Sequence, residues 1–331
     1  MKIEGRLFLV TGGTGFIGAG LVKGLLAAGA RVRSLDNDSR GSIEKLGDAA
    51  DHVERVTGDI REPAAVLRAA DGVDSVCHLA YVNGTEFFYS KPDLVLEVAV
   101  KGMMNVIDAC LHHQVDELIL ASSSEVYQTP PQVPTDESAP LVVPDVLNPR
   151  FSYGGGKIIS ELLAINYGRT RIPRVVIFRP HNVYGPDMGF EHVVPQFAMG
   201  LSEVCHRHPV GTVSFPIQGT GKETRSFIYI DDAVDAVLRV IERGDHLAVY
   251  HVGSGVETSI EALAAAIGRS FGREVAVVPG PPLPGSTLRR CPNITKLRGL
   301  GFIPRVSLEE GLARTVPWYT TGPGAKKWLL E

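Results

Sequence analysis

Short apolar runs alternate with longer segments of helical periodicity over the first 180 residues. RLFLVTG, residues 6–12, has the length and composition of a buried strand. GFIGAGLVKGLLAAGA, residues 15–30, has its apolar side chains at helical spacing, and RVRSLD, residues 31–36, has the pattern of the next strand. A strand, a helix and a second strand in this order predict a βαβ unit with parallel strands.

The same alternation continues as far as Pro180. Further strands are predicted in HVERVTGD, SVCHLA, ELILASS and RVVIFRP. Helices are predicted between them in REPAAVLRAA, in DLVLEVAVKGMMNVIDACLHH and in the segment after Tyr153. The pattern therefore predicts an α/β fold, a doubly wound parallel sheet of the Rossmann type.

Beyond Pro180 the sequence pattern changes. Proline and glycine are dense over residues 180–225 and 278–286, while residues 230–244 form an apolar helical pattern and 248–254 a strand that rejoins the first sheet. We expect a first domain of residues 1–181 plus about 226–256. A smaller, discontinuous C-terminal domain, residues 182–225 and 257–331, is expected to bind substrate, with a cleft between the two.

Composition narrows the function classes. The 331 residues are 44% hydrophobic and 21% charged, with a net charge of -4, so no nucleic-acid partner is expected. Four cysteines without CxxC spacing indicate reduced thiols, and the histidine pairs at 112–113 and 206/208 lack companion ligands, so no metal is expected. No leader and no run of 18 apolar residues is present, which favours a cytoplasmic protein without membrane contact.

The stretch TGGTGFIG supplies glycines directly after the first strand. Gly12, Gly15 and Gly18 let the backbone approach a pyrophosphate at the helix N-terminus, although a tight turn without a ligand has the same pattern. Asp36 ends the second strand, where a carboxylate accepts hydrogen bonds from a ribose diol. The Asp36 carboxylate would repel the 2'-phosphate of NADP and so favours NAD. The positive charges of the nearby Arg31, Arg33 and Arg40 weaken this preference. Asp59 faces the adenine or caps the following helix.

A second group of residues points to proton transfer. Tyr153 and Lys157 are four residues apart and share one helix face, where the ammonium would lower the pKa of the phenol towards that of a general base. The strand 117–123 ends in hydroxyls and one carboxylate, Ser122, Ser123, Ser124 and Glu125, at the sheet edge where ligands bind. The alternative for Tyr153 and Lys157 is an exposed helix face.

These motifs together resemble the extended short-chain dehydrogenase/reductase superfamily, in its nucleotide-sugar epimerase/dehydratase branch. The matching pieces run in family order: TGGTGFIG, Asp36, GDI, HLA, SSSEVY, YGGGK, RPHNVYGP, ETRSFIYIDD and GFIPRVSLEEGL. The resemblance implies that Ser123, Tyr153 and Lys157 are catalytic and that NAD stays bound through turnover. It places the following residues at the cofactor: Gly12, Gly15, Phe16, Ile17, Gly18, Asp36, Asp59, Ile60, Leu79, Ala80, Ser122, Tyr153, Lys157, His181 and Val183.

The same resemblance implies a nucleotide-diphosphate sugar as substrate. Asn182, Arg225 and Arg290 match positions that hold the diphosphate in relatives, and the strand around Phe215 is expected to line the base pocket. A guanidinium suits phosphate oxygens. Otherwise Arg225 would form a surface ion pair with Asp231 or Asp232, and Arg290 would be a solvated loop residue.

The shared mechanism implies a 4-keto sugar. Tyr153 takes the proton of the 4-hydroxyl while hydride passes to NAD, and Ser123 hydrogen-bonds the same oxygen. Ser124 stands where dTDP-glucose 4,6-dehydratases have an acidic residue, which weakens dehydration. Glu125 is compatible with the dehydratases and decarboxylases that carry Thr-Ser-Glu, or it is a structural partner of a nearby hydroxyl or amide.

Epimerisation at C4 is the leading prediction because it makes the fewest demands on these residues. The glycines between Tyr153 and Lys157, and Gln128 where relatives usually have glycine, depart from every subfamily pattern. An alternative of another class is a non-catalytic NAD-binding regulator. Residues 94–113 and 153–168 resemble the helices of a two-fold contact in relatives, so a homodimer is expected unless their apolar residues pack wholly against the sheet.

Overall fold

The computed structural model describes residues 2–282 and 285–328, so residues 283–284 and 329–331 of the expected second domain lie outside it. Its centre is a seven-stranded sheet in the order β11-β6-β5-β4-β1-β2-β3. All neighbouring strands in it are parallel. The strands are β1 (Leu7–Thr11), β2 (Arg31–Asp36), β3 (Val53–Thr57), β4 (Ser75–His78), β5 (Glu117–Ala121), β6 (Arg174–Pro180) and β11 (Ala248–Val252). This confirms the predicted Rossmann-type α/β fold, including the return of the late strand to the sheet.

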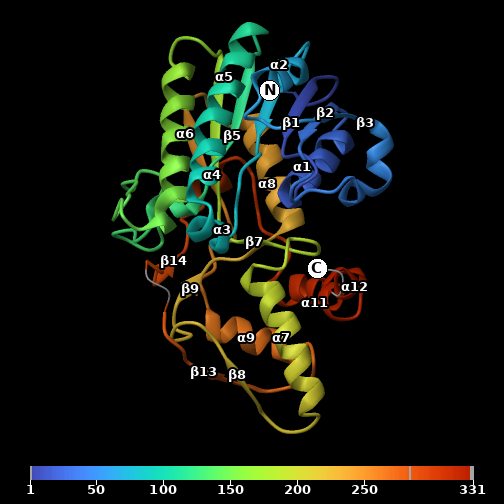
Figure 1. Ribbon diagram of the computed structural model, residues 1–331, viewed down its shortest axis with the longest axis vertical. Helices are drawn as coiled ribbons and strands as arrows, with labels where there is room; N and C mark the ends of the chain where they lie inside the picture. Colours follow the sequence, from blue (N-terminus) through green and yellow to red (C-terminus); the bar gives the residue numbers. More distant parts are fainter. Residues whose placement is uncertain (1, 283–284, 329–331) are drawn as a thin grey trace.

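Helices cover both faces of this sheet (Figure 1). One apolar cluster joins the sheet to α1 (Phe16–Ala27) and α8 (Ile230–Arg243). A second cluster joins the opposite face to α2 (Pro63–Ala69), α5 (Met103–His112) and α6 (Ser152–Gly168). β1 and β5 are mostly apolar because both faces of the sheet are covered: every residue of these two strands is buried, including Glu117, which pairs with Arg174.

Most of the segments after β6 form a second, smaller group, which lies below the sheet in Figure 1 and has an apolar cluster of its own. Its elements are β7 (Val183–Tyr184), α7 (Val193–Arg207), β8 (Val213–Pro216), β9 (Thr224–Arg225), β10 (Ile228–Tyr229), β12 (Thr258–Ser259), α9 (Ile260–Arg269), β13 (Val275–Val278), β14 (Arg289–Arg290), α11 (Leu308–Thr320) and α12 (Pro323–Trp328). β9 pairs with β14 so that Arg225 stands opposite Arg290. The predicted guanidinium pair is therefore built by two strands far apart in sequence.

Short elements complete the chain. They are η1 (Ile43–His52), α3 (Thr85–Ser90), α4 (Pro92–Glu97), η2 (Val98–Gly102), η3 (Ser124–Tyr127), η4 (Pro149–Phe151) and α10 (Thr295–Gly299). The carboxyl ends of β1, β2, β4, β5 and β6 lead into the candidate site. Across residues 2–282 and 285–328, none of the helices has the length and apolar character needed to span a bilayer.

Candidate functional site

The glycine turn joins β1 to α1. Gly12 has φ +73, and a Cβ there would stand 2.8 Å from the amide nitrogen of Ala80. A Cβ at Gly18 would stand 1.9 Å from the carbonyl oxygen of Gly12. Gly15, the N-cap of α1, has only the Gly12 oxygen nearby, at 3.2 Å, and contributes no side chain to the helix end. Two glycines thus let the turn close, and Gly15 leaves the first amides of α1, at Phe16, Ile17 and Gly18, without a capping side chain.

Asp36 fixes this turn from the end of β2. Its carboxylate accepts hydrogen bonds from the backbone amides of Thr14 and Asp38, both at 3.0 Å. Thr14 also donates its hydroxyl to Asp38 at 2.9 Å. A carboxylate has about four acceptor positions, so two remain for a ribose diol beside the glycine turn.

The ends of the neighbouring strands complete the same edge. Asp59 accepts the backbone amide of Arg61 at 2.8 Å, and hydrogen bonds from the Arg61 guanidinium lower the pKa of the carboxyl. The alternative role of Asp59 as a helix cap is wrong, since Glu62 is the N-cap of α2. Ile60 is buried, and its carbonyl accepts the amide of Asn105 at 2.8 Å.

The turn after β4 is held by Thr11. The backbone amides of Leu79 and Ala80 both donate to the Thr11 hydroxyl at 3.2 Å. These bonds bring Ala80 against Gly12, so the ends of β1 and β4 form one continuous wall of the site.

Tyr153, on the first turn of α6, is buried rather than on an exposed face, so that alternative is wrong. Its ring stacks on Phe88 at 4.7 Å between centroids and meets the edge of Tyr81 at 5.1 Å. The Ser123 side chain acts to lower the pKa of Tyr153. Ser123 follows β5 as the N-cap of η3, where its hydroxyl accepts the backbone amide of Glu125 at 3.1 Å.

Burial raises the pKa of Tyr153 to about 12, against the lowering effects of the Ser123 hydrogen bond, Arg290 and Arg40. This direction differs from the predicted lowering by Lys157. The Lys157 ammonium donates instead to the carbonyl of Ala121 at 2.7 Å, 6.0 Å from the centroid of the Tyr153 ring. Burial lowers the pKa of Lys157 to about 7, opposed by Glu161, so the lysine is itself only partly charged near neutrality.

Ser122 turns away from this pair into a buried polar network. Its hydroxyl donates to Glu161, which also pairs with Arg179 at 2.6 Å. Arg179 donates to the hydroxyl of Tyr127, and that hydroxyl contacts Nε2 of His251 at 2.7 Å. The network ties the carboxyl ends of β5, β6 and β11 to α6.

Glu125 lies in the short turn η3 and faces three guanidinium groups. Arg290 donates to its carboxylate at 2.6 Å, and Arg150 lies 3.4 Å from its other oxygen. Burial would raise the pKa of Glu125, but Arg290, Arg150 and Arg225 outweigh it and lower the pKa to about 2. Ser124, the residue before it, is buried.

Both alternatives for the arginines are wrong. Arg290 is 3% exposed, so it is not a solvated loop residue. Asp231 pairs with Arg314 at 3.6 Å, and Asp232 accepts the backbone amides of residues 305 and 306, so neither binds Arg225. Arg225 donates to the carbonyl of Thr224 at 2.7 Å, and burial beside Arg290 lowers its pKa to about 10.

The other predicted residues lie on two sides of this cluster. His181 is fully buried against His251, with no partner for either ring nitrogen among the described residues. Asn182 has φ +34 and donates its side-chain amide to the carbonyl of Ser226 at 3.2 Å, while Val183 starts β7. The ring of Phe215 packs on Phe197 inside the apolar cluster of the smaller group, 5.2 Å between centroids.

Three contributors were missed from the sequence. Tyr81 contacts both Tyr153 and Lys157, Arg150 adds a third cation, and the side-chain amide of Gln128 donates to the carbonyl of Glu125 at 2.6 Å. Arg150 and Tyr81 each lie within three residues of a recognised motif, YGGGK and HLA. That proximity was the signal for Arg150 and Tyr81, whereas Gln128 was marked by its departure from the family pattern but was not assigned a role.

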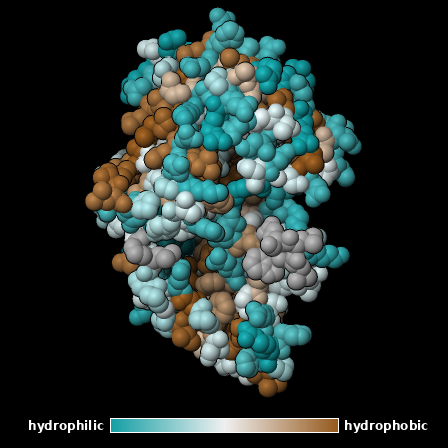
Figure 2. All heavy atoms as spheres, viewed as in Figure 1, coloured by the Kyte–Doolittle hydropathy of each residue, from teal (hydrophilic) through white to brown (hydrophobic). Residues whose placement is uncertain are grey.

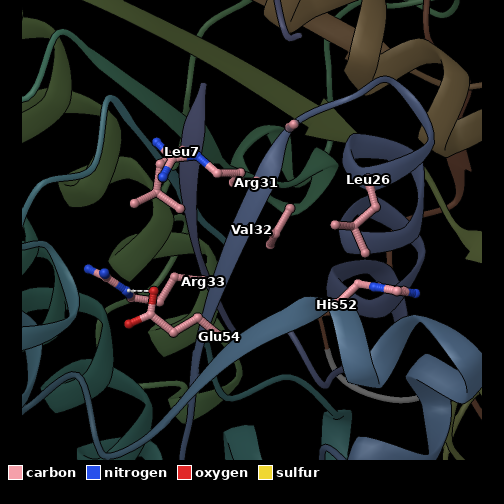
Figure 3. A pocket seen from close by; sticks show the side chains of 8 residues that line it. Leu7, Leu26, Arg31, Val32, Arg33, His52 and Glu54 are labelled. Carbon is pink, nitrogen blue, oxygen red and sulfur yellow. Dashed lines mark ion pairs between the residues drawn. The ribbon is translucent and has the colours of Figure 1, made fainter. Parts of the chain in front are cut away.

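A hollow of about 610 Å³ lies at the opposite edge of the sheet (Figure 3). It is lined by the amino ends of β1, β2 and β3, with an ion pair of 2.9 Å between Arg33 and Glu54. It is separate from the residues above, which gather at the carboxyl ends. Within the described part of the chain, no group of three His, Cys, Asp or Glu residues could hold a metal ion.

Three curated relatives cover 94% of the chain. They are a dTDP-glucose 4,6-dehydratase of Streptomyces niveus, 30% identical over 92% of its own length, and a UDP-glucose 4-epimerase of Mycolicibacterium smegmatis, 32% identical over 97%. The third is a UDP-N-acetyl-alpha-D-glucosaminuronate decarboxylase of Bacillus cytotoxicus, 29% identical over 97%. At about 30% identity these relatives do not distinguish the three reactions.

Two solved structures share the whole fold. DesIV, a dTDP-glucose 4,6-dehydratase of Streptomyces venezuelae with NAD and TYD bound, is 30% identical, has a TM-score of 0.84 and aligns over 96% of this chain and 98% of its own. The UDP-glucose 4-epimerase of Thermus thermophilus in complex with NAD is 28% identical, has a TM-score of 0.83 and aligns over 96% and 99%.

The glycine turn and the carboxylate of Asp36 fit NAD, because the turn leaves the backbone at Gly15 uncovered and the carboxylate keeps free acceptor positions. The model of the NAD-dependent epimerase/dehydratase family matches residues 8–253. The cofactor is NAD, in agreement with the neighbouring NAD complexes. The chain belongs to the NAD-dependent epimerase/dehydratase family, whose members include nucleotide-sugar epimerases, dehydratases and decarboxylases.

Proposed function

We propose that this enzyme is a nucleotide-diphosphate-sugar 4-epimerase that works through a transient 4-keto sugar. The state of Glu125 carries the proposal: its carboxylate is paired with Arg290 and Arg150 and has a pKa of about 2. Dehydration and decarboxylation through C5 chemistry would use this residue as a base. A general base works best with a pKa near the working pH, so a carboxylate this acidic is poorly suited to removing the C5 proton.

Tyr153 and Ser123 take the proton-transfer roles in this proposal. The Tyr153 oxygen accepts the proton of the sugar 4-hydroxyl, and the Ser123 hydroxyl hydrogen-bonds the same oxygen. Arg290, Arg40 and the Ser123 hydrogen bond all favour the phenolate and so act against burial. The charged fraction of Lys157, whose nitrogen is 6.0 Å from the centroid of the Tyr153 ring, also favours the phenolate. When bound at the glycine turn and Asp36, NAD would supply reversible hydride-transfer chemistry.

The charges of the substrate site support a nucleotide diphosphate. Arg150, Arg225 and Arg290 set three positive charges against the single negative charge of Glu125. A sugar-nucleotide diphosphate carries two negative charges, which match this excess of two. Within the described residues, Arg40, which also acts on Tyr153, is paired with Glu191, so these charges favour a neutral hexose over a uronic acid. Asn182 and the strand of Phe215 complete the proposed substrate site.

The remaining assignments from the sequence are proposals of the same kind. The residues expected at the cofactor are proposed to bind NAD, and residues 1–181 plus about 226–256 to form the domain that carries it. Residues 182–225 and 257–331 are proposed to form the substrate domain. The apolar cluster of the smaller group supports this division in part, although Phe227 and Tyr229 belong to it. Ile294, Leu297 and Phe302, from the proposed substrate domain, pack with the sheet instead.

A homodimer is proposed from the surface of α4 and α6. Leu96, Ile159 and Leu162 are exposed there, Leu162 by 58%, so these helices do not bury all their apolar residues against the sheet. Figure 2 shows apolar atoms over the helices at the upper left of Figure 1. Light scattering of the eluted protein tests the state: a mass of about 36 kDa would exclude the dimer, since one chain weighs 35.6 kDa.

The function is tested by incubating the purified protein with a panel of UDP, dTDP, GDP, CDP and ADP sugars, followed by mass spectrometry and NMR. An epimerase leaves the mass unchanged and alters the C4 proton coupling. Loss of water or of carbon dioxide would instead identify a dehydratase or a decarboxylase. Bound NAD without turnover of any sugar would favour a non-catalytic regulator.

A further inference from the structure

Tyr81, in the loop that follows β4, contacts both Tyr153 and Lys157. The Lys157 nitrogen is 3.8 Å from the centroid of the Tyr81 ring. The same ring meets that of Tyr153 edge to face, with centroids 5.1 Å apart at 83°. One aromatic side chain therefore contacts both members of the pair.

The surrounding backbone is built to admit this ring. Ala80, the residue before it, is anchored to the Thr11 hydroxyl at 3.2 Å. On α6, a Cβ at Gly156 would stand 2.3 Å from the Tyr81 hydroxyl and 2.7 Å from the Cβ of Ala99. The glycine that departs from the subfamily patterns thus leaves the space that the Tyr81 hydroxyl occupies.

Few other groups favour a charge on Lys157. On its own helix, Lys157 faces Tyr153 and Glu161. The Glu161 carboxylate already forms an ion pair with Arg179 at 2.6 Å. On β4, Lys157 faces His78. Burial and, to a smaller extent, the charge of Lys157 lower the pKa of His78 to about 3, so its imidazole is neutral. On β5, Lys157 meets the carbonyl of Ala121. The negative face of an aromatic ring attracts an ammonium, most strongly where water is excluded.

We propose that Tyr81 is a positioning residue: its ring face holds Lys157 as a cation, and its ring edge fixes the orientation of Tyr153. This inference rests on the proposed roles of Tyr153 and Lys157. It adds a residue outside their helix. The Tyr81 hydroxyl also donates to the backbone carbonyl of Tyr153 at 3.5 Å, but the effect on Lys157 is assigned to the aromatic face.

The test is an NMR titration of Lys157 in protein labelled with ¹³C-lysine, with the signal assigned by its loss in a Lys157→Arg variant. Tyr81→Phe keeps the ring and removes only the hydroxyl, so the pKa of Lys157 should match the wild type. Tyr81→Leu keeps apolar bulk without an aromatic face, so the pKa should fall by about one unit. If the leucine variant does not fold, Tyr81→Met replaces it.

Phe88→Leu is the matched control. It removes the ring stacked on the other side of Tyr153, at 4.7 Å, and should leave the Lys157 titration unchanged. An unchanged pKa in the leucine or methionine variant would overturn the proposal. So would a fall of equal size in the phenylalanine variant, because the hydroxyl would then be responsible.

The titration needs no substrate, so it is independent of the proposed reaction. Once a nucleotide sugar is turned over, the pH profile of kcat/KM gives a second readout. The limb that reports Lys157 should move to lower pH in Tyr81→Leu by the amount seen in the titration, and not in Tyr81→Phe. If no sugar reacts, the proposed function fails while the titration still decides the role of Tyr81.

Discussion

The side-chain amide of Gln128 occupies the space above Gly154: its nitrogen is 2.6 Å from the position that a Cβ on residue 154 would take. Gln128 has φ +51 and donates that amide to the carbonyl of Glu125, also at 2.6 Å. The glutamine and the glycine both depart from the family pattern. The contact links the two departures. The large side chain of Gln128, which follows η3, fits because residue 154 on α6 has no side chain.

The first prediction follows from this contact. Gly154→Ala should displace the Gln128 amide and destabilise the protein by about 1–3 kcal/mol. Gln128→Gly in the same chain should recover part of that loss, since glycine also relieves the positive φ. Recovery is incomplete because the new Cβ would remain 3.0 Å from the Glu125 carbonyl oxygen. Urea unfolding of both single variants and the double variant measures the coupling, and additive losses would contradict it.

This pair also marks the limit of prediction from the sequence. The sheet, the glycine turn and the Tyr153–Lys157 spacing were predictable because each depends on local periodicity or on a short motif. The contact between Gln128 and Gly154, and the approach of Arg150 to Glu125, depend on tertiary packing that no local pattern encodes. The pKa of Tyr153 was predicted in the wrong direction because the spacing gives a neighbour but not the degree of burial.

Tyr153→Phe should separate catalysis from stability. The ring contacts with Phe88 and Tyr81 remain, and only the hydroxyl group is lost. We expect the turnover rate to fall by about 10²–10⁴-fold, as for loss of a general base. The free energy of unfolding should change by about 1 kcal/mol or less. A variant with near-normal turnover would show that another group takes the proton.

Glu125→Gln should distinguish the possible reactions. The change removes the negative charge but keeps the shape and one acceptor oxygen for Arg290. Epimerisation should continue with a loss of roughly tenfold or less, because hydride return does not need a base at C5. Dehydration or decarboxylation should collapse. Product NMR measures the outcome, and an inactive epimerase would contradict the assignment of Glu125 as a counter-ion.

The same residue predicts a dependence of stability on pH. The pKa of Glu125 is about 2 in the folded protein against an ordinary value of 4.5. A lowered pKa stabilises the fold above the ordinary value and loses this effect as the pH falls towards 2. The difference corresponds to at most about 3 kcal/mol, of which about 1 kcal/mol is lost by pH 3.5.

Urea unfolding of the wild type and of Glu125→Gln at pH 7 and 3.5 checks this linkage. The wild type should lose about 1 kcal/mol more than the variant over that interval. The variant should be the less stable of the two at pH 7, since three guanidinium groups then repel one another without a counter-ion. Equal losses in the two proteins would show that the arginines do not hold the carboxylate in solution.

The last prediction concerns the buried pair of Glu161 and Arg179. Their side chains are 6% and 4% exposed, and two hydrogen bonds of 2.8 and 2.6 Å join them. Glu161→Gln or Arg179→Met should each cost about 3–5 kcal/mol, because each leaves an uncompensated buried charge. The double variant should cost less than the sum, since neither charge then remains. Glu203→Gln breaks a surface pair with Arg207 and should change stability by less than about 0.5 kcal/mol. Urea unfolding measures these changes. If the losses of stability in the two single variants add up in the double variant, Glu161 and Arg179 act separately, and the pair does not hold Ser122.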